Sequence, residues 1–280
     1  MSSLPIECPP DVSSQPSGAA VVFEDVHLSF EDNPVLSGVS FRLPLGETKA
    51  LFGVAGSGKS SILKLVLGLI PPDSGRITVL GNEVTQLPEQ ELFPMRAHLG
   101  MVFQESALFD SLTVRENVAY RLMEEHGIYD DEIDRRVRET LRFVELEHTL
   151  DLYPSELSGG MRRRVAIARA IITQPELLLY DSPTGGLDPV TSNTIIELIM
   201  KQRDVYRTSS LLVTHRLQDA FTLATHEFDP KTNTLRALPR GQYCDVPMSF
   251  LVLRDGKVTF DGDVRQLATT KDEYIREYIS

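Results

Sequence analysis

The sequence has few cysteines, no long apolar run and a shortage of positive charge. Cys8 and Cys244 are its two cysteines in 280 residues, and they form no paired motif. Isolated thiols of this kind favour a reducing compartment, where disulfides are rare. Apolar residues make up 41% of the chain, but the longest apolar runs fall well short of the roughly 18 residues that span a bilayer. We therefore expect a soluble protein with two free thiols.

Positive charge is outnumbered, with 28 Lys and Arg against 40 Asp and Glu and a net charge of −12. Binding to nucleic acid or to an anionic membrane surface is driven by clustered Lys and Arg. We therefore expect no nucleic-acid partner, no direct membrane insertion, and membrane contact only through another protein. Residues 1–20 are rich in Pro and Ser and lack the basic start and apolar core of a secretory signal. This composition predicts a disordered tail.

The next part of the chain alternates between β and helical patterns. Residues 21–30 and 35–43 alternate apolar and polar side chains on either side of a turn at 32–34, which predicts an antiparallel β layer. A short strand at 49–52 then runs into a glycine-rich loop, and residues 62–69 have the apolar spacing of a helix. The order strand, loop, helix predicts one α/β domain, for which we expect the bounds 21–265.

The glycine-rich loop satisfies the phosphate-loop pattern at every fixed position. It reads Gly53, Val54, Ala55, Gly56, Ser57, Gly58, Lys59 and Ser60, and Ser61 follows as a further expected contact. Glycines let backbone N–H groups curl around a phosphate at a helix N-terminus. Lys59 is expected to reach the β- and γ-phosphates and Ser60 to ligate Mg²⁺. The loop therefore predicts nucleotide binding.

A second motif is the apolar run 177–180, which ends in Asp181. Such a run is typical of a parallel strand buried on both faces. A carboxylate at the C-terminal end of this strand lies where ligands bind in such sheets, and Asp181 is expected to hold Mg²⁺ through water. A plain strand-ending aspartate in a turn is the alternative.

With these motifs in this order, the chain resembles the nucleotide-binding subunit of an ABC transporter over roughly 21–263. The resemblance implies an α/β fold with a mixed central sheet flanked by helices, an antiparallel β layer and an inserted helical subdomain at about 105–160. A capping box at Thr113 and Glu116 agrees with that subdomain. The resemblance also implies ATP and Mg²⁺ as cofactors, a polytopic permease as partner, and a cytoplasmic position against the bacterial inner membrane.

The resemblance extends to individual residues. Phe30 matches the aromatic that stacks on adenine, although a core Phe is the alternative, and Gln104 matches the glutamine that touches Mg²⁺ and the attacking water. Ser158, Gly159 and Gly160 match the signature motif, which approaches the γ-phosphate of ATP bound to the opposite subunit. These matches imply a head-to-tail dimer with two shared sites, formed by two copies or by this chain and a related subunit.

Two further residues match in the same order behind the signature. Asp188 takes the position of the fixed aspartate in the loop that communicates across the dimer, and His215 takes that of the switch histidine that contacts the γ-phosphate. For His215, an ordinary satisfied polar residue at the end of a strand is the alternative.

Ser182 departs from the family pattern. The family has a glutamate after the strand aspartate, which polarises the attacking water, and a serine hydroxyl cannot accept a proton in its place. Loss of a positioned base costs about 10²–10⁴-fold in rate. We hypothesise reduced but non-zero turnover. Three explanations stay open: a slow homodimer, a degenerate half of a heterodimer, and a rearrangement in which another acid supplies the base.

Several short sequence segments resemble, within this family, the ATPases of MCE-type lipid transporters. Met161 and residues 107–114 are the strongest evidence for this narrower resemblance. Such systems pair the ATPase dimer with a permease and a periplasmic MCE-domain protein. An insertion at about 226–247 is predicted to be a surface hairpin or loop, and residues 266–280 are predicted to form a tail helix. The alternatives are an importer of another solute, an ATPase acting on ribosomes or DNA, and a clamp that binds ATP without turnover. One phosphate loop, no heptad run and no basic patch count against action on ribosomes or DNA.

Overall fold

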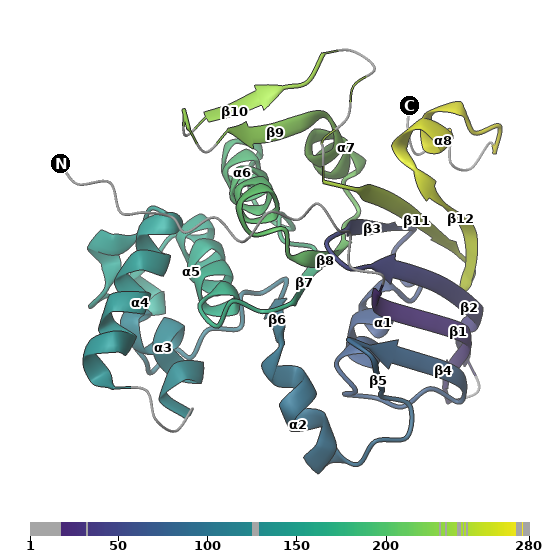
Figure 1. The fold of residues 1–280 in the computed structure, drawn as a ribbon, viewed down its shortest axis with the longest axis horizontal. Coiled ribbons are helices and arrows are strands. Elements are labelled where there is room, and N and C mark those ends of the chain that lie inside the picture. Colours follow the sequence, from purple (N-terminus) through teal and green to yellow (C-terminus); the bar gives the residue numbers. More distant parts are fainter. Residues whose placement is uncertain are drawn as a thin grey trace.

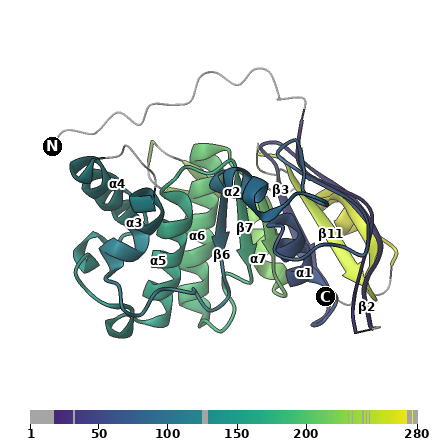
Figure 2. The same cartoon turned by 90° about the horizontal axis from the view of Figure 1, so that it is seen from below.

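The computed structural model describes residues 18–31, 33–124, 129–229, 231–232, 234–239, 242, 244, 246–272 and 276. These residues form a mixed central sheet with an antiparallel β layer on one side, helices on the other and a helical subdomain at one end (Figures 1 and 2). The central sheet has the order β12-β11-β3-β8-β7-β6, and every neighbouring pair is parallel except β11 and β12. Its strands are β3 (Thr48–Phe52), β6 (Leu99–Val102), β7 (Leu177–Asp181), β8 (Ser209–Val213), β11 (Met248–Arg254) and β12 (Lys257–Asp263).

The central strands supply two separate hydrophobic cores. Leu177 and Leu179 of β7 pack in the core shared with the antiparallel layer, whereas Leu178 and Tyr180 pack in the core shared with the helices on the opposite face. This division follows from the strand geometry, in which successive side chains point to opposite faces. Because both faces are covered, β7 is apolar at every one of these positions, as expected for a parallel strand.

The antiparallel layer has the order β2-β1-β4-β5. Its strands are β1 (Ala19–Phe30), β2 (Asn33–Pro44), β4 (Ser74–Val79) and β5 (Asn82–Glu83). The strand β1 begins two residues before the predicted start, because Ala20 is already buried in the core of this layer. Most of the tail predicted over 1–20 lies outside the described residues.

The helices of the nucleotide core follow the sequence pattern with shifted bounds. They are α1 (Lys59–Val66), α2 (Glu89–Ala97), α5 (Gly159–Ile171), α6 (Pro189–Tyr206), α7 (Leu217–Thr225) and α8 (Val264–Thr269). The helix α1 starts directly at the phosphate loop and ends before the predicted residue 69, because Gly68 takes a left-handed φ of 63°. Of the tail helix predicted over 266–280, the structure has α8, while 273–275 and 277–280 lie outside the described residues.

The helical subdomain comprises α3 (Val114–Glu124), α4 (Asp130–Phe143) and two short 3₁₀ helices, η1 (Glu147–Thr149) and η2 (Pro154–Glu156). The predicted capping box is present, since Glu116 accepts from the Thr113 backbone at 2.7 Å and Thr113 accepts from the Glu116 backbone at 3.3 Å. The segment predicted as a hairpin or loop forms an antiparallel pair of strands, β9 (His226–Asp229) and β10 (Thr234–Ala237). Among the described helices, none has the length and apolar character needed to cross a membrane.

Candidate active site

Four neighbouring parallel strands end at the same edge of the central sheet, and a predicted site residue stands at or just after each end. The phosphate loop follows β3, His215 follows β8, Asp181 ends β7, and Gln104 follows β6. In parallel sheets, ligands bind outside the carboxyl ends of the strands. The structure therefore brings these four parts together, although they are far apart in the sequence.

The phosphate loop is held in a shape that only glycine permits at two positions. Gly53 and Gly58 have φ of 150° and 95°, and a Cβ added at Gly53 would lie 2.4 Å from a backbone oxygen of β11. Lys59 folds over the loop and donates from Nζ to the carbonyl oxygens of Gly53 and Val54, at 2.8 and 2.7 Å. The loop is thus preshaped, with its cation at the centre, for a polyphosphate.

The Ser60 hydroxyl and the Asp181 carboxylate meet at the base of the loop, where Ser60 Oγ donates to Asp181 Oδ1 at 3.2 Å. Burial raises the pKa of Asp181 and lowers that of Lys59, and each of the two charges partly offsets the shift of the other. An oxygen pair of this kind fits Mg²⁺, which takes one or two protein ligands and completes its shell with phosphates and water. The described residues include no cluster of three or more acidic, His or Cys side chains that could hold a metal unaided.

Ser182 lies in a tight turn directly after β7. Its φ is 45°, a left-handed conformation that is uncommon outside glycine. The turn is fixed by two hydrogen bonds, from Ser182 N to Val213 O and from Gly185 N to Ser182 O, both 2.8 Å. Gln104 lies against the same turn, since a Cβ at Gly185 would be 3.5 Å from Gln104 Cγ. The residue at 182 is therefore placed beside the glutamine that the sequence predicts for the site.

A buried carboxylate next to this turn was not predicted from the sequence. Thr184 Oγ1 donates to Asp219 Oδ2, and Arg216 Nε lies 3.7 Å from Asp219 Oδ1. Burial raises the pKa of Asp219, while the Thr184 hydroxyl, Arg216 and His215 oppose that rise. The contact links the turn after β7 to the start of α7, which follows His215. The sequence has no local signal for this contact, because Thr184 and Asp219 are 35 residues apart.

The signature residues form the N-terminus of α5. Ser158 Oγ caps the helix by accepting from Met161 N at 3.2 Å. Gly160 lies against α6, because a Cβ there would be 2.3 Å from Thr191 Cγ2. Figures 1 and 2 both place α5 and α1 on opposite sides of β6 and β7. The signature and the phosphate loop of one chain are therefore separate. Phe30 lies at the end of β1 and is 46% exposed.

Asp188 caps the adjacent helix, α6. Its Oδ1 accepts from the backbone N–H groups of Val190 and Thr191, both at 3.0 Å. The Thr191 hydroxyl, followed by the backbone donors, holds the pKa of Asp188 below its ordinary value. The folded state thus favours the ionised carboxylate.

Asp188→Ala is expected to lower the melting temperature by about 2–4 °C at pH 7, because the cap of α6 is lost. Since the folded pKa is depressed, this contribution is present above about pH 4 and disappears as the pH falls through the folded pKa. Melting curves of wild type, Asp188→Ala and Asp188→Asn from pH 3 to 7 are the measurement. Asparagine also caps helices, so a loss in Asp188→Asn as large as in Asp188→Ala would contradict the capping role.

The arginines of α5 hold neighbouring loops through their backbone carbonyls. Arg163 is 4% exposed and donates to Phe103 O at 2.6 Å and to Gly185 O at 3.3 Å. Arg169 donates to Ala107 O at 2.7 Å. Burial lowers the pKa of Arg163, and the charges of nearby Glu105 and Asp181 act against that change. Arg163 thus ties together the segments that carry Gln104 and Ser182, a role that was not predicted from the sequence.

Comparison with known proteins agrees with this geometry. A family model described as ABC transporter matches residues 36–185. Over 271 residues, the chain is 36% identical to the Arabidopsis thaliana protein trigalactosyldiacylglycerol 3, chloroplastic. The aligned region covers 94% of this chain and 74% of that protein. It is 41% identical over 179 residues to the methionine import ATP-binding protein MetN of Bifidobacterium longum, with 64% of this chain and 44% of that protein covered.

A solved structure shows the same fold. It is a dimeric ATP-binding cassette in a post-hydrolysis state bound to ADP and phosphate, with a TM-score of 0.73 and 28% identity over 88% of this chain and 99% of that chain. The family model spans more than half of the 280 residues, and the fold predicted from the sequence is confirmed. The chain therefore belongs to the ABC transporter family, as an ATP-binding ATPase domain whose cofactors are ATP and Mg²⁺.

Proposed function

We propose that this ATPase powers a membrane transporter of lipids, and that ATP bound between two subunits drives their association. The convergence of the phosphate loop, Asp181, Gln104 and His215 at one sheet edge carries the proposal. Phosphoryl transfer needs mainly positioning and charge stabilisation. The shared edge supplies both from four different segments of the chain.

Each part of the edge has a distinct role in this proposal. The loop from Gly53 to Ser61 and the ammonium of Lys59 bind the phosphates, and Phe30 stacks on the adenine. Ser60, Asp181 and Gln104 hold Mg²⁺, which supplies charge neutralisation at the phosphates when it is bound. His215, exposed after β8, contacts the γ-phosphate. Ser182 stands where a base would act, which predicts slow hydrolysis.

The signature residues act on the nucleotide of the other subunit. The N-terminus of α5 presents the N–H groups of Gly159 and Gly160 and the positive end of the helix dipole, which together attract an anion. Both figures separate α5 from the phosphate loop of the same chain. A second subunit arranged head to tail, with Asp188 at the contact, would bring one signature to each nucleotide.

Ser158→Arg is therefore expected to abolish ATP-dependent dimerisation while leaving nucleotide binding intact. The large cation occupies the place of the γ-phosphate at the contact, but it is remote from the loop that binds ATP in the same chain. Light scattering with and without MgATP measures the dimer, and fluorescence of a labelled nucleotide measures binding. Lys59→Ala is the matched control, since it should lose both. Dimers of Ser158→Arg equal to wild type would refute the shared site.

A permease would dock on the aromatic surface beside the loop after Gln104. Phe109 and Tyr120 are each more than 40% exposed, and their ring centroids are 4.7 Å apart. The loop under them is fixed by Asn117, which donates to Phe109 O at 3.0 Å and accepts from Phe109 N at 2.8 Å. Exposed aromatic surface of this kind marks interaction sites. Leu108 instead packs partly against the core.

Two observations support a lipid as the substrate. The sequence segments around Met161 and at residues 107–114 resemble those of MCE-type ATPases. The Arabidopsis thaliana relative, whose alignment covers 94% of this chain, is named after a glycolipid. The name of the methionine import relative supports a second candidate, import of an amino acid. Transport by the assembled permease complex decides between them, with labelled phospholipid and labelled methionine compared in the same vesicles. Co-purification of an MCE-domain protein with that complex would add to the lipid assignment.

A further inference from the structure

A groove of about 800 Å³ lies at the edge of the sheet opposite the active site. Its walls include residues 45–46 before β3, residues 175–176 before β7 and residues 208–209 at the start of β8, together with α4 of the helical subdomain and the end of α6. The groove is therefore bounded by the nucleotide core on one side and by the helical subdomain on the other.

The groove combines aromatic and apolar surface with an excess of arginine. Phe143 and Tyr206 stand 5.9 Å apart between ring centroids, and Ile171 and Ile172 add aliphatic surface. The charged lining residues are Arg135, Arg136, Arg207, Glu139 and Glu176. Thus three cations face two anions, although the whole chain has a net charge of −12.

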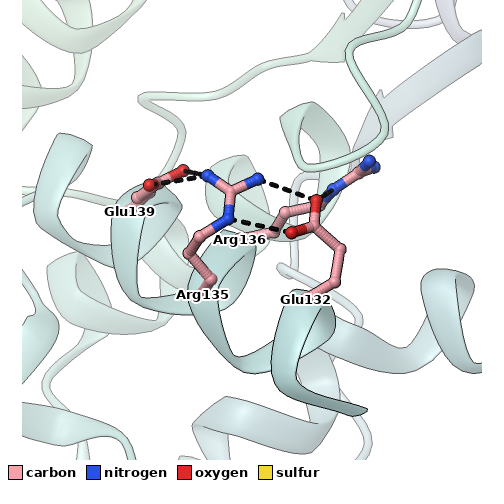
Figure 3. Close-up of polar contacts among 4 residues, drawn as sticks. All are labelled: Glu132, Arg135, Arg136 and Glu139. Carbon is pink, nitrogen blue, oxygen red and sulfur yellow. Dashed lines mark hydrogen bonds and ion pairs between the residues drawn. The ribbon is translucent and has the colours of Figure 1, made fainter. Parts of the chain in front are cut away.

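Two of these arginines are already paired within α4. Figure 3 shows Glu132 bridging Arg135 and Arg136, and Arg135 also reaching Glu139. The exposed Arg207, by contrast, has no ion pair with any residue that the structure describes. It is the cation available to an acidic occupant.

Gln202 provides a buried acceptor that an occupant of the groove could pair with a hydrogen-bond donor. Its side chain is 3% exposed and lines the groove, and its Oε1 has no partner among the described residues. A buried unpaired carbonyl oxygen costs about 1–3 kcal/mol. A free anion would satisfy Arg207 but offers no donor to Gln202. A peptide offers both, since its backbone has N–H groups.

The described chain begins at the rim of this groove. Leu45 N donates to Gly18 O at 3.3 Å, and Leu45 is one of the lining residues. Residues 1–17 therefore join the fold where the groove opens. At ~3.3 Å per residue, a segment of this length can span any part of the groove.

We propose that residues 1–17 occupy this groove. The segment contains Glu7 and Asp11 and no Lys or Arg, which matches the excess of arginine. It has four prolines, and proline-rich segments are recognised in extended form by aromatic-lined grooves at low entropic cost. Leu4, Ile6 and Val12 supply the apolar side chains.

Docking of the segment would tie the helical subdomain to the nucleotide core. One end of it is anchored at Gly18 on the antiparallel layer, and the groove wall formed by α4 belongs to the helical subdomain. The segment therefore restrains any rotation of α4 relative to β3 and β8. This inference concerns the fold alone and does not depend on the transported substrate.

Cross-linking in the full-length protein tests the proposal. Cys244→Ser leaves Cys8 as the natural thiol, and serine keeps the hydrogen bond that Cys244 makes to Val246 O. In this background, Gln174→Cys places a thiol on the groove wall, and Gln90→Cys places one on the exposed start of α2. With a short bismaleimide, Cys8 should link to position 174 at least about tenfold faster than to position 90, because docking raises the local concentration.

A charge swap gives the second readout. Arg207→Glu in the Gln174→Cys protein should slow the reaction to the rate seen at position 90, and adding Glu7→Arg with Asp11→Arg should restore it. Melting curves confirm that each variant is folded. Equal rates at positions 174 and 90 would overturn the proposal, as would cross-links that join two molecules in place of two sites in one chain.

Discussion

Ser182→Glu is expected to raise the rate of ATP hydrolysis by about 100-fold or more. A positioned general base contributes about 10²–10⁴-fold, and a serine hydroxyl does not supply one at neutral pH. The turn that carries Ser182 is fixed by backbone hydrogen bonds to Val213 and Gly185. Glutamate can therefore take the same backbone position at the conformational cost that serine already bears. Its carboxylate then lies beside Gln104, at the sheet edge that carries the phosphate loop, Asp181 and His215.

Steady-state hydrolysis by the assembled transporter is the measurement, with Ser182→Gln as the matched control. Glutamine has the size of glutamate but accepts no proton, so it should stay near the wild-type rate. A third variant, Asp219→Asn, tests whether the buried carboxylate beside the turn is already the base. If Asp219→Asn abolishes turnover and Ser182→Glu has no effect, the lack of a carboxylate at residue 182 does not limit the rate of hydrolysis.

Arg163→Met is expected to lower hydrolysis by about 10- to 100-fold and to destabilise the fold. The methionine fills a similar volume but leaves Phe103 O and Gly185 O without their buried donor. Hydrogen bonds from a charged donor contribute about 1.5–3 kcal/mol each, so we expect a loss of about 3 kcal/mol in unfolding free energy. The rate falls because Gln104 and the turn at 182 lose their common support, and small displacements at a reacting centre are costly.

The change in rate should be measured in the Ser182→Glu background, where turnover is fast enough to show a decrease. Arg163→Lys is the control that keeps the charge, and it should recover part of the activity through one of the two carbonyl contacts. A purely structural role predicts that kcat follows the fraction of folded protein and that KM stays constant. A lower kcat in fully folded Arg163→Met protein is the result that supports positioning.

The order of motifs along the chain made much of the fold predictable. The run 177–181 and the phosphate loop each have a strong local signal, because a buried strand and a glycine turn depend on few neighbours. The two hydrophobic cores follow from the same run, since alternate residues of β7 face opposite sides. The helix bounds were less accurate: α1 ends at Val66, whereas the sequence predicted a helix up to residue 69.

The tertiary contacts of the site were not predictable in the same way. Asp219 and Thr184 are 35 residues apart, and their hydrogen bond depends on how β7 and β8 pair. The role of Arg163 was not predicted either, because its burial depends on how α5 packs in the folded domain. Side chains that bridge loops leave no periodic pattern, because both of their acceptors are backbone carbonyls.

The hairpin of β9 and β10 is bound to the domain by a buried ion pair of α6. Arg203 and Asp204 of α6 form an ion pair at 2.6 Å with 1% and 10% of their side chains exposed. Arg203 donates to His226 O at 3.0 Å, and Asp204 accepts from Phe228 N at 2.8 Å. Deleting the hairpin would expose the Arg203–Asp204 pair and remove its hydrogen-bond partners His226 O and Phe228 N. Removal of the hairpin would therefore need a compensating change at Arg203 and Asp204 of α6.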